Sequence, residues 1–383
     1  MSKLEQLIAE LCPNGVEYKT IGEIALDIYR GSGITREQIT PAGTPCVRYG
    51  EIYTTYDIWF DECVSYTDES VIANKKYFEY GDILFAITGE NVEDIAKSSA
   101  YIGDKKCLAG GDIVVLKHNQ DPKFLSYVLS TTFVRRQKSK GKVKSKVVHS
   151  SVPAIKEIRI PLPPLPVQRE IVRILDNFTE LTTQLSAELA ARRKQYEYYR
   201  DLLLTFGDEA EWKTLGEVCE KIASGKNKSR NDSGEFPVYG STGIIAYSDS
   251  YSYNEELLLV ARVGANAGFV HKAKGQYDVS DNTLIVKPKK SYNLSFAYYQ
   301  LLNMKLNNLA VGGGQPLITA GKLKQVKIPV PPLDEQERIA AILNRFDALC
   351  NDLTSGIPAE IEARQKQYEY YRDKLLSFKE VMA

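Results

Sequence analysis

The chain has 383 residues, of which 43% are hydrophobic and 26% charged, a balance typical of globular proteins and sufficient for two domains of about 150 residues. Its 49 basic and 49 acidic residues give a formal net charge of +0, so a contact with nucleic acid has to come from local basic patches. The six cysteines form no CxxC pair, which disfavours a zinc site and predicts reduced thiols. Without an apolar run of about 20 residues, we expect a soluble, cytoplasmic protein that does not enter a membrane.

The first half of the chain predicts both helices and strands. Apolar residues at positions 4, 7, 8 and 11 have helical spacing, and the segment EYKTIGEI follows at 17–24. The runs DILFAITG at 82–89 and DIVVL at 112–116 are typical of buried strands. Asp121 and Pro122 have the character of an N-cap and a first helical position. The first globular part should therefore mix α and β structure.

A proline-rich gate, IPLPPLPVQREI at 160–171, separates this part from a long helix, because proline lacks the amide donor that a helix interior needs. From Ile171 to Phe206, apolar or aromatic residues recur in alternating steps of four and three, with Thr182 and Arg192 as exceptions. This spacing predicts a coiled-coil seam of about five heptads. We expect no break in this helix.

The second half of the chain repeats this framework. The counterparts, in chain order, are EWKTLGEV at 211–218, LLLVARVG at 257–264, TLIV at 283–286, a helix near 294–309, IPVPPLDEQERI at 328–339, and ARQKQYEYYRDKLLSF at 363–378, which repeats ARRKQYEYYRDLLLTF at 191–206. Residues 34–80 and 228–255 have no text in common. The framework repeats while the contents of the two parts differ.

The second seam contains one additional step of four residues, which is a stutter in the heptad pattern. Gly356 and Pro358 lie beside it, so we expect the second helix to break or kink there, with Pro358 starting the next segment. Two seams of nearly equal length can bury each other, which predicts an antiparallel pair. The end of the second helix should then meet the start of the chain, in a nearly circular molecule.

The predicted fold class is α+β, with two globular domains separated by two long antiparallel coiled-coil helices in a pseudo-twofold repeat. We place the globular domains at 1–165 and 207–333 and the helical regions at 166–206 and 334–379. The residues expected at the coiled-coil or partner interface are Gln168, Ile171, Leu175, Phe178, Tyr196, Tyr199, Gln336, Ile339, Leu343, Phe346, Tyr368 and Tyr371. For the tyrosines, packing is favoured over a ligand site.

The sequence offers no catalytic motif. A methyltransferase would need a glycine loop for its cofactor and an Asn/Asp-Pro-Pro-aromatic motif, and neither is found. GKNKSR at 225–230 lacks the spacing of a phosphate-binding loop. The histidines at 118, 149 and 271 are too dispersed for a catalytic or metal cluster. We therefore predict neither a catalytic residue nor a metal site.

Basic residues cluster in FVRRQKSKGKVKSK, which has no acidic residue between Phe133 and Ser151. Neutralisation of DNA phosphates is one interpretation, and a solvated loop is the other. The candidates in this stretch are Arg135, Arg136, Lys138, Lys140, Lys142 and Lys144.

In the second half, the candidate phosphate contacts are Lys226, Lys228 and Arg230. Arg262, Asn266 and Gln315 carry donors or amides of the kind that read base edges. The glycines at 312–314 either permit a close approach of the backbone to DNA or form a flexible turn.

The segment PNGVEYKTIGEI, both proline-rich gates and both KQYEYYRD copies resemble the specificity subunit of type I restriction-modification systems. The resemblance covers the whole chain. It implies that the globular parts are target recognition domains, which bind the unlike halves of a bipartite, asymmetric site on double-stranded DNA. The first helix lacks the SGIPAE segment of the second.

The resemblance further implies that the repeated helices dock two modification subunits, which transfer a methyl group from S-adenosylmethionine to adenine. A restriction subunit that translocates DNA is an optional further partner. The chain itself would be a non-catalytic subunit without a cofactor of its own. The alternative is a coiled-coil adaptor that organises protein partners without reading DNA.

Overall fold

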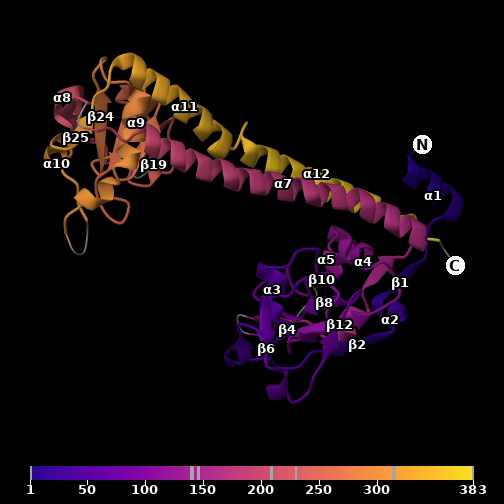
Figure 1. Cartoon of the computed structure of the whole chain (residues 1–383). Coiled ribbons are helices and arrows are strands. Elements are labelled where there is room, and N and C mark those ends of the chain that lie inside the picture. Colours follow the sequence, from indigo (N-terminus) through magenta and orange to yellow (C-terminus); the bar gives the residue numbers. More distant parts are fainter. Residues whose placement is uncertain are drawn as a thin grey trace. The chain divides into compact units, whose positions relative to one another are not determined.

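The computed structural model describes residues 2–138, 142–144, 147–207, 210–228, 231–312 and 316–381, with side chains for all of these except 142–144 and 147. The chain forms two compact units (Figure 1). Unit 1 comprises Met1–Gln184 and Glu362–Ala383, and unit 2 comprises Leu185–Ile361. Both combine helices and strands, as the sequence predicts.

Unit 1 contains two five-stranded sheets. The order of the central sheet is β2 (Asp27–Arg30), β12 (Ile113–Lys117), β8 (Ile83–Ala86), β10 (Ser98–Tyr101) and β5 (Trp59–Phe60). The order of the outer sheet is β3 (Ile39–Thr40), β6 (Ser65–Thr67), β4 (Thr44–Val47), β11 (Cys107–Ala109) and β7 (Tyr77–Phe78). A small sheet contains β13 (Lys142–Lys144), β14 (Val147–His149) and β9 (Thr88–Gly89). The helices of the globular part are α1 (Lys3–Leu11), α2 (Ile21–Ile24), α3 (Tyr49–Thr54), α4 (Pro122–Leu129), α5 (Thr132–Lys138) and α6 (Val152–Lys156).

The central sheet of unit 1 is buried on both faces. Along β8, Ile83 and Phe85 pack with α4 in one core cluster, while Leu84 and Ala86 pack with residues of the outer sheet in another. Alternate residues of a strand point to opposite faces, so a strand covered on both sides needs a continuous apolar run. The segment DILFAITG contains an uninterrupted apolar run because its strand β8 is covered on both faces.

Unit 2 repeats this arrangement with four strands in each sheet. The central order is β17 (Cys219–Ser224), β24 (Thr283–Pro288), β21 (Leu257–Ala261) and β22 (Val270–Ala273). The outer order is β19 (Gly243–Ser248), β18 (Phe236–Gly240), β23 (Gln276–Val279) and β20 (Tyr253–Asn254). The helices of the globular part are α8 (Leu215–Val218), α9 (Leu294–Asn303) and α10 (Ala320–Lys324).

The same two-stranded sheet closes both units. In unit 1, β1 (Tyr18–Thr20) pairs with β15 (Arg159–Pro161), and Tyr18 lies opposite Pro161. In unit 2, β16 (Trp212–Thr214) pairs with β25 (Lys327–Pro329), and Trp212 lies opposite Pro329. The entry segments and the gates found in the sequence are therefore one structural element, used twice with one register.

The long helices begin at the gates. Helix α7 (Leu165–Leu203) is continuous, whereas the second helix consists of α11 (Leu333–Asn351) and α12 (Ile357–Leu375). The predicted break beside Gly356 and Pro358 is confirmed. No helix in the described part of the chain is long and apolar enough to cross a bilayer.

The long helices are antiparallel within each unit, as predicted. In unit 1, Phe178 of α7 stacks on Tyr371 of α12 with ring centroids 5.6 Å apart, and the earlier Ile171 shares a cluster with the later Phe378. In unit 2, Tyr199 of α7 stacks on Phe346 of α11 at 5.8 Å.

The two ends of the chain meet in unit 1, which confirms a further expectation. The amide of Val16 donates to the carbonyl of Lys379 at 2.8 Å, and the amide of Val381 donates to the carbonyl of Val16 at 3.0 Å. The Tyr18 hydroxyl donates to the carbonyl of Phe378 at 3.0 Å. The segment after α12 is thus tied to the entry segment that precedes β1.

One expected helix is shorter than its pattern. The apolar spacing near 294–309 predicts a single helix, but α9 ends at Asn303 and a short 3₁₀ helix follows at Leu306–Leu309. Lys305 between them has a φ of 48°, a left-handed conformation that a regular helix cannot include.

Candidate functional site

In both units the ends of three strands form an equivalent surface, which we call the strand-end surface. In unit 1 it comprises Gly31–Ser32, Ile87–Thr88 and Gly110–Asp112, which follow β2, β8 and β11. In unit 2 it comprises Gly225–Lys226, Arg262–Val263 and Ser280–Asn282, which follow β17, β21 and β23. Loops that connect rigid strands are where binding residues most often lie.

A glycine is required at the same point of this surface in each unit. The amide of Gly31 donates to the carbonyl of Ile113 at 2.8 Å, and the amide of Gly225 donates to the carbonyl of Thr283 at 3.0 Å. A Cβ atom on either glycine would lie 2.2 Å from a backbone carbonyl oxygen. No side chain fits there, so the chain can approach the backbone of Gly110 in unit 1 and of Val279 in unit 2 this closely only at glycine.

Hydrogen bonds also match the residues that follow the central strands. The amide of Ile87 donates to the carbonyl of Asp112 at 3.0 Å, and the amide of Arg262 donates to the carbonyl of Asn282 at 2.9 Å. Ile87 therefore corresponds to Arg262, and Asp112 to Asn282. The framework is shared, while the side chains on it are not.

The candidate DNA contacts of unit 2 lie on or beside this surface. Lys226 and Lys228 are exposed just after Gly225, and Asn266 is exposed on the turn between β21 and β22. Arg262 is half-buried. Arg230, Gln315 and the glycines at 313–314 lie outside the described residues.

The basic stretch of unit 1 forms a helix and a hairpin over its described residues. Arg135 and Arg136 are exposed on α5. The strands β13 and β14 then pair, and β14 joins β9 beside Ile87, so the hairpin is attached to the strand-end surface. The side chains of Lys142 and Lys144, and the whole of Lys140, are outside the described residues.

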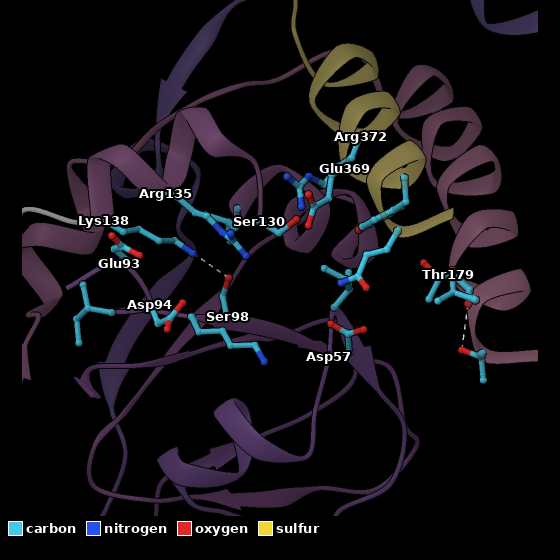
Figure 2. A pocket seen from close by; sticks show the side chains of 18 residues that line it. Asp57, Glu93, Asp94, Ser98, Ser130, Arg135, Lys138, Thr179, Glu369 and Arg372 are labelled. Carbon is cyan, nitrogen blue, oxygen red and sulfur yellow. Dashed lines mark hydrogen bonds between the residues drawn. The ribbon is translucent and has the colours of Figure 1, made fainter. Parts of the chain in front are cut away.

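Lys138 departs from the expected surface position. Its side chain points inward, is only 8% exposed, and donates to the Ser98 hydroxyl at 3.2 Å (Figure 2). The ammonium group lies 5.6 Å from the centroid of the Phe85 ring. Burial lowers the pKa of Lys138 to about 7. The basic run predicts an exposed phosphate contact at Lys138, whereas the structure turns the amine inward to Ser98.

Lys138 faces a cavity of about 280 Å³ that lies between the globular part of unit 1 and the unit-1 segments of α7 and α12 (Figure 2). Arg135 and Arg372 line it together with acidic side chains, among them Asp57 and Glu369. Because both signs of charge are present, the cavity does not favour an anion over a cation.

The candidate interface residues mostly pack inside the units. Gln168 and Gln336 are fully buried and hold the start of a neighbouring helix: their side-chain oxygens accept from the amide of Asp121 at 3.1 Å and of Asn293 at 2.7 Å. The following residues are also buried: Ile171, Leu175, Ile339 and Leu343. Ring contacts within the units engage Phe178, Tyr196, Tyr199, Phe346, Tyr368 and Tyr371.

Two exposed tyrosines were missed by the sequence reasoning. Tyr198 is 65% exposed and Tyr370, its copy in the second KQYEYYRD segment, is 61% exposed. Each makes an edge contact with the next tyrosine, with ring centroids 5.4 and 5.3 Å apart. The heptad pattern does not include either tyrosine, because both lie off the seam. The signal that could have identified them is the exact repeat of the segment KQYEYYRD.

The described residues do not bring together three side chains of His, Cys, Asp or Glu in a group that could hold a metal. All six cysteines are free and buried. His118 and His271 are half-buried, and desolvation lowers the pKa of both, that of His118 to about 4.

The comparisons with known proteins agree with one another, because the family model, the relatives and the solved structures are all of the same kind. A family model described as a type I restriction modification DNA specificity domain matches residues 13–191 and 208–363. The EcoR124I/EcoR124II specificity subunit of Escherichia coli is 40% identical over 58% of this chain and 63% of its own length. The EcoprrI specificity subunit of Escherichia coli is 38% identical over 50% of this chain and 51% of its own length. The matched part of the chain thus spans less than two thirds of these two relatives.

Another relative and a solved structure match over a larger share of their length. A putative type I specificity subunit of Mycoplasma pneumoniae is 35% identical over 58% of this chain and 94% of its own length. The crystal structure of the S subunit of a type I restriction-modification system from M. genitalium has a TM-score of 0.58 at 18% identity, covering 94% of this chain and 96% of the other. The structural likeness concerns the fold alone.

Proposed function

The chain belongs to the family of type I restriction-modification DNA specificity subunits, and from this membership we propose that it reads a divided DNA target, one half with each globular unit. The observation that carries the proposal is the shared framework with unlike surfaces. The register of the closing sheets and the glycine at the strand-end surface are the same in both units. The partly exposed side chains beside them differ, as at the equivalent positions Asp112 and Asn282. Two unlike surfaces on one framework suit an asymmetric, bipartite duplex target.

The chain itself is a non-catalytic subunit in this proposal. Modification subunits carry S-adenosylmethionine and methylate adenine, and a restriction subunit is an optional further partner. We place the assembly in the cytoplasm, where reduced thiols like the six free cysteines of the chain persist. The repeated helical segments support two modification subunits for each chain, and the exposed Tyr198 and Tyr370 offer one equivalent contact to each of them. Tyrosine is enriched among the residues that dominate protein interfaces.

The test is to reconstitute the chain with its modification subunit and to measure binding and methyl transfer on duplexes that contain or lack the methylated target. We expect target-selective binding that weakens with salt, and methyl transfer only when both subunits are present. An assembly that forms but binds all duplexes alike would favour the coiled-coil adaptor. Methyl transfer by the isolated chain would contradict a non-catalytic role.

A further inference from the structure

Each unit holds one arginine guanidinium at the same place on its strand-end surface, but a different strand supplies it. In unit 1 the arginine is Arg30, at the end of β2. Its Nε donates to the carbonyl of Gly111 and its Nη2 pairs with the carboxylate of Asp112.

In unit 2 the arginine is Arg262, which follows β21. Its Nη1 donates to the carbonyl of Asp281 at 3.3 Å and to the hydroxyl of Ser224 at 3.2 Å. Its Nε is buried and has no hydrogen-bond partner among the described residues.

The two carbonyl groups occupy corresponding positions. The carbonyl of Asp112 accepts the amide of Ile87 in unit 1, and the carbonyl of Asn282 accepts the amide of Arg262 in unit 2. Gly111 directly precedes Asp112, and Asp281 directly precedes Asn282. Ser224, which Arg262 contacts, corresponds to Arg30, because each directly precedes the glycine that lies against a backbone carbonyl group, Gly31 or Gly225. The two units thus place a guanidinium at one point by two different routes.

We propose that these two guanidinium groups are matched contacts to the DNA backbone, one in each half of the target. The inference rests on the proposed function and deepens it. The two units differ in the side chains that would read bases, so a group that both retain at one position serves a part of DNA that is the same in both halves. That part is the phosphate backbone, whose contacts fix position and carry no sequence information.

The surroundings of both groups suit this role. The Arg30 side chain is 59% exposed, and a Cβ added at the nearby Gly33 would meet no atom within 4 Å, so the surface beside it is open. In unit 2 the exposed Lys226 and Lys228 follow Gly225 on the same surface.

In unit 1 the contacts to Gly111 and Asp112 engage Nε and Nη2 of Arg30, so Nη1 is the donor that remains to bind a phosphate. In unit 2 the contacts to Asp281 and Ser224 engage Nη1 of Arg262 and its Nε is buried, so Nη2 remains. A guanidinium held in this way presents a fixed charged donor to the phosphate.

The units differ in local charge. Asp112 neutralises Arg30, whereas the corresponding residue in unit 2 is Asn282, and the described residues offer no carboxylate bonded to Arg262. The Asp112→Asn variant therefore gives unit 1 the chemistry of unit 2. It should strengthen binding to every duplex, because it removes a negative charge from beside the DNA.

The experiment uses the full chain assembled with its modification subunits, and measures binding to a target duplex and to a scrambled duplex between about 50 and 200 mM salt. We expect Arg30→Gln and Arg262→Gln each to weaken binding to both duplexes by the same factor, about tenfold, and to lower the salt slope by about 1. Arg30→Lys and Arg262→Lys, which keep the charge, should keep the slope. Arg169→Gln on α7 and Arg345→Gln on α11 remove the same charge from exposed helical positions and serve as controls.

The outcomes separate the inference from the function on which it rests. If the wild-type assembly does not distinguish the two duplexes, the proposed function fails. If it does, and an arginine variant changes the preferred base in one half of the target, that arginine reads a base and the inference is wrong. Unchanged affinity and slope in the Gln and Asp112→Asn variants would mean that the guanidinium groups only tie strands together. Thermal melting identifies any variant that does not fold, and the Lys and Asp112→Asn variants then decide the question.

Discussion

The buried ammonium group of Lys138 should make the stability of unit 1 depend on pH. Burial lowers its pKa to about 7, and unfolding returns it to the ordinary value near 10.5. Between these two pH values the unfolded chain binds more protons than the folded chain, so the free energy of unfolding should rise with pH and this gain should be lost as the pH falls towards 7. Lys138→Met should flatten the rise and stabilise the protein at pH 7 by about 1 to 3 kcal/mol.

Thermal melting between pH 6 and pH 9 checks this expectation. Lys156→Met is the matched control, since Lys156 is exposed at the end of α6. Equal pH profiles for the wild type and Lys138→Met would show that the amine is hydrated in solution.

Gly31 and Gly225 should tolerate no side chain. Gly31→Ala and Gly225→Ala each place a Cβ atom 2.2 Å from a backbone carbonyl oxygen, so a strand has to move. We expect each variant to lose about 2 kcal/mol or more of the free energy of unfolding. Gly33→Ala, where a Cβ would contact nothing within 4 Å, should change the free energy of unfolding by about 1 kcal/mol or less. Thermal melting of the three variants decides it, and similar losses at Gly31 and Gly33 would contradict the close approach of the strands.

At the scale of the helices, the two exposed tyrosines should contribute to docking without contributing to the fold. Tyr198→Ala and Tyr370→Ala should each weaken binding of the modification subunit by about 1 to 2 kcal/mol, because they remove a large exposed ring from the proposed contact surface. Tyr196→Ala is the contrasting variant, since its ring packs in the core of unit 2 and its loss should lower the melting temperature. Titration calorimetry measures the affinity. If the two exposed variants bind as tightly as the wild type, the partner uses another face.

The sequence predicted those elements whose pattern is local. Asp121 and Pro122 do begin a helix, and the stutter beside Gly356 does mark a break between α11 and α12. The apolar run at 82–89 contains β8 (Ile83–Ala86), a strand buried on both faces. In each case a few neighbouring residues carry the whole signal.

What the sequence did not predict depends on tertiary contacts. Nothing in a basic run distinguishes Lys138, which turns inward to Ser98, from Arg136, which is exposed. Gln168 fits a helical surface, and only the fold brings it to the amide of Asp121. The correspondence of Arg30 and Arg262 is also hidden, because they lie at different positions of the repeat and meet the same carbonyl position only after the strands pair.

At the scale of the whole molecule, two modification subunits should bind each chain. The tyrosine-rich segment occurs twice, once at the end of α7 and once in α12, and in each copy the second tyrosine is the most exposed one, to nearly the same fraction. Equivalent surfaces should bind equivalent partners. Native mass spectrometry of the reconstituted assembly gives the ratio directly. A fully active assembly with a single modification subunit would contradict the expected stoichiometry.

The double variant Tyr198→Ala and Tyr370→Ala refines this measurement. If the two surfaces are independent, each single variant should yield a population that holds one modification subunit, and the double variant should hold none at the same concentration. Loss of both partners in a single variant would instead indicate that the two binding events are coupled.

The length of α7 should set the preferred spacing between the two halves of the DNA target. The helix is continuous from Leu165 to Leu203 and contributes residues to both units. Four residues inserted after Ser186 would lengthen it by about 6 Å, or nearly 2 base pairs at ~3.4 Å each. They would also turn the helix by about 40° beyond a full turn, whereas two base pairs rotate the second half of the target by about 70°. Because the two rotations differ, we expect lower activity together with a longer optimal spacer.

The measurement is methylation of a duplex library in which both halves of the target are constant and the spacer varies. The same four residues inserted after Ser355 are the control. That position lies in the segment between α11 and α12, where the helix is already interrupted and can accommodate extra residues without a change in helical register. We expect the control to keep the wild-type spacer optimum and the insertion in α7 to shift it. If the α7 variant remains active with the original optimum, the helix does not measure the DNA, and its role is confined to holding the partner subunits.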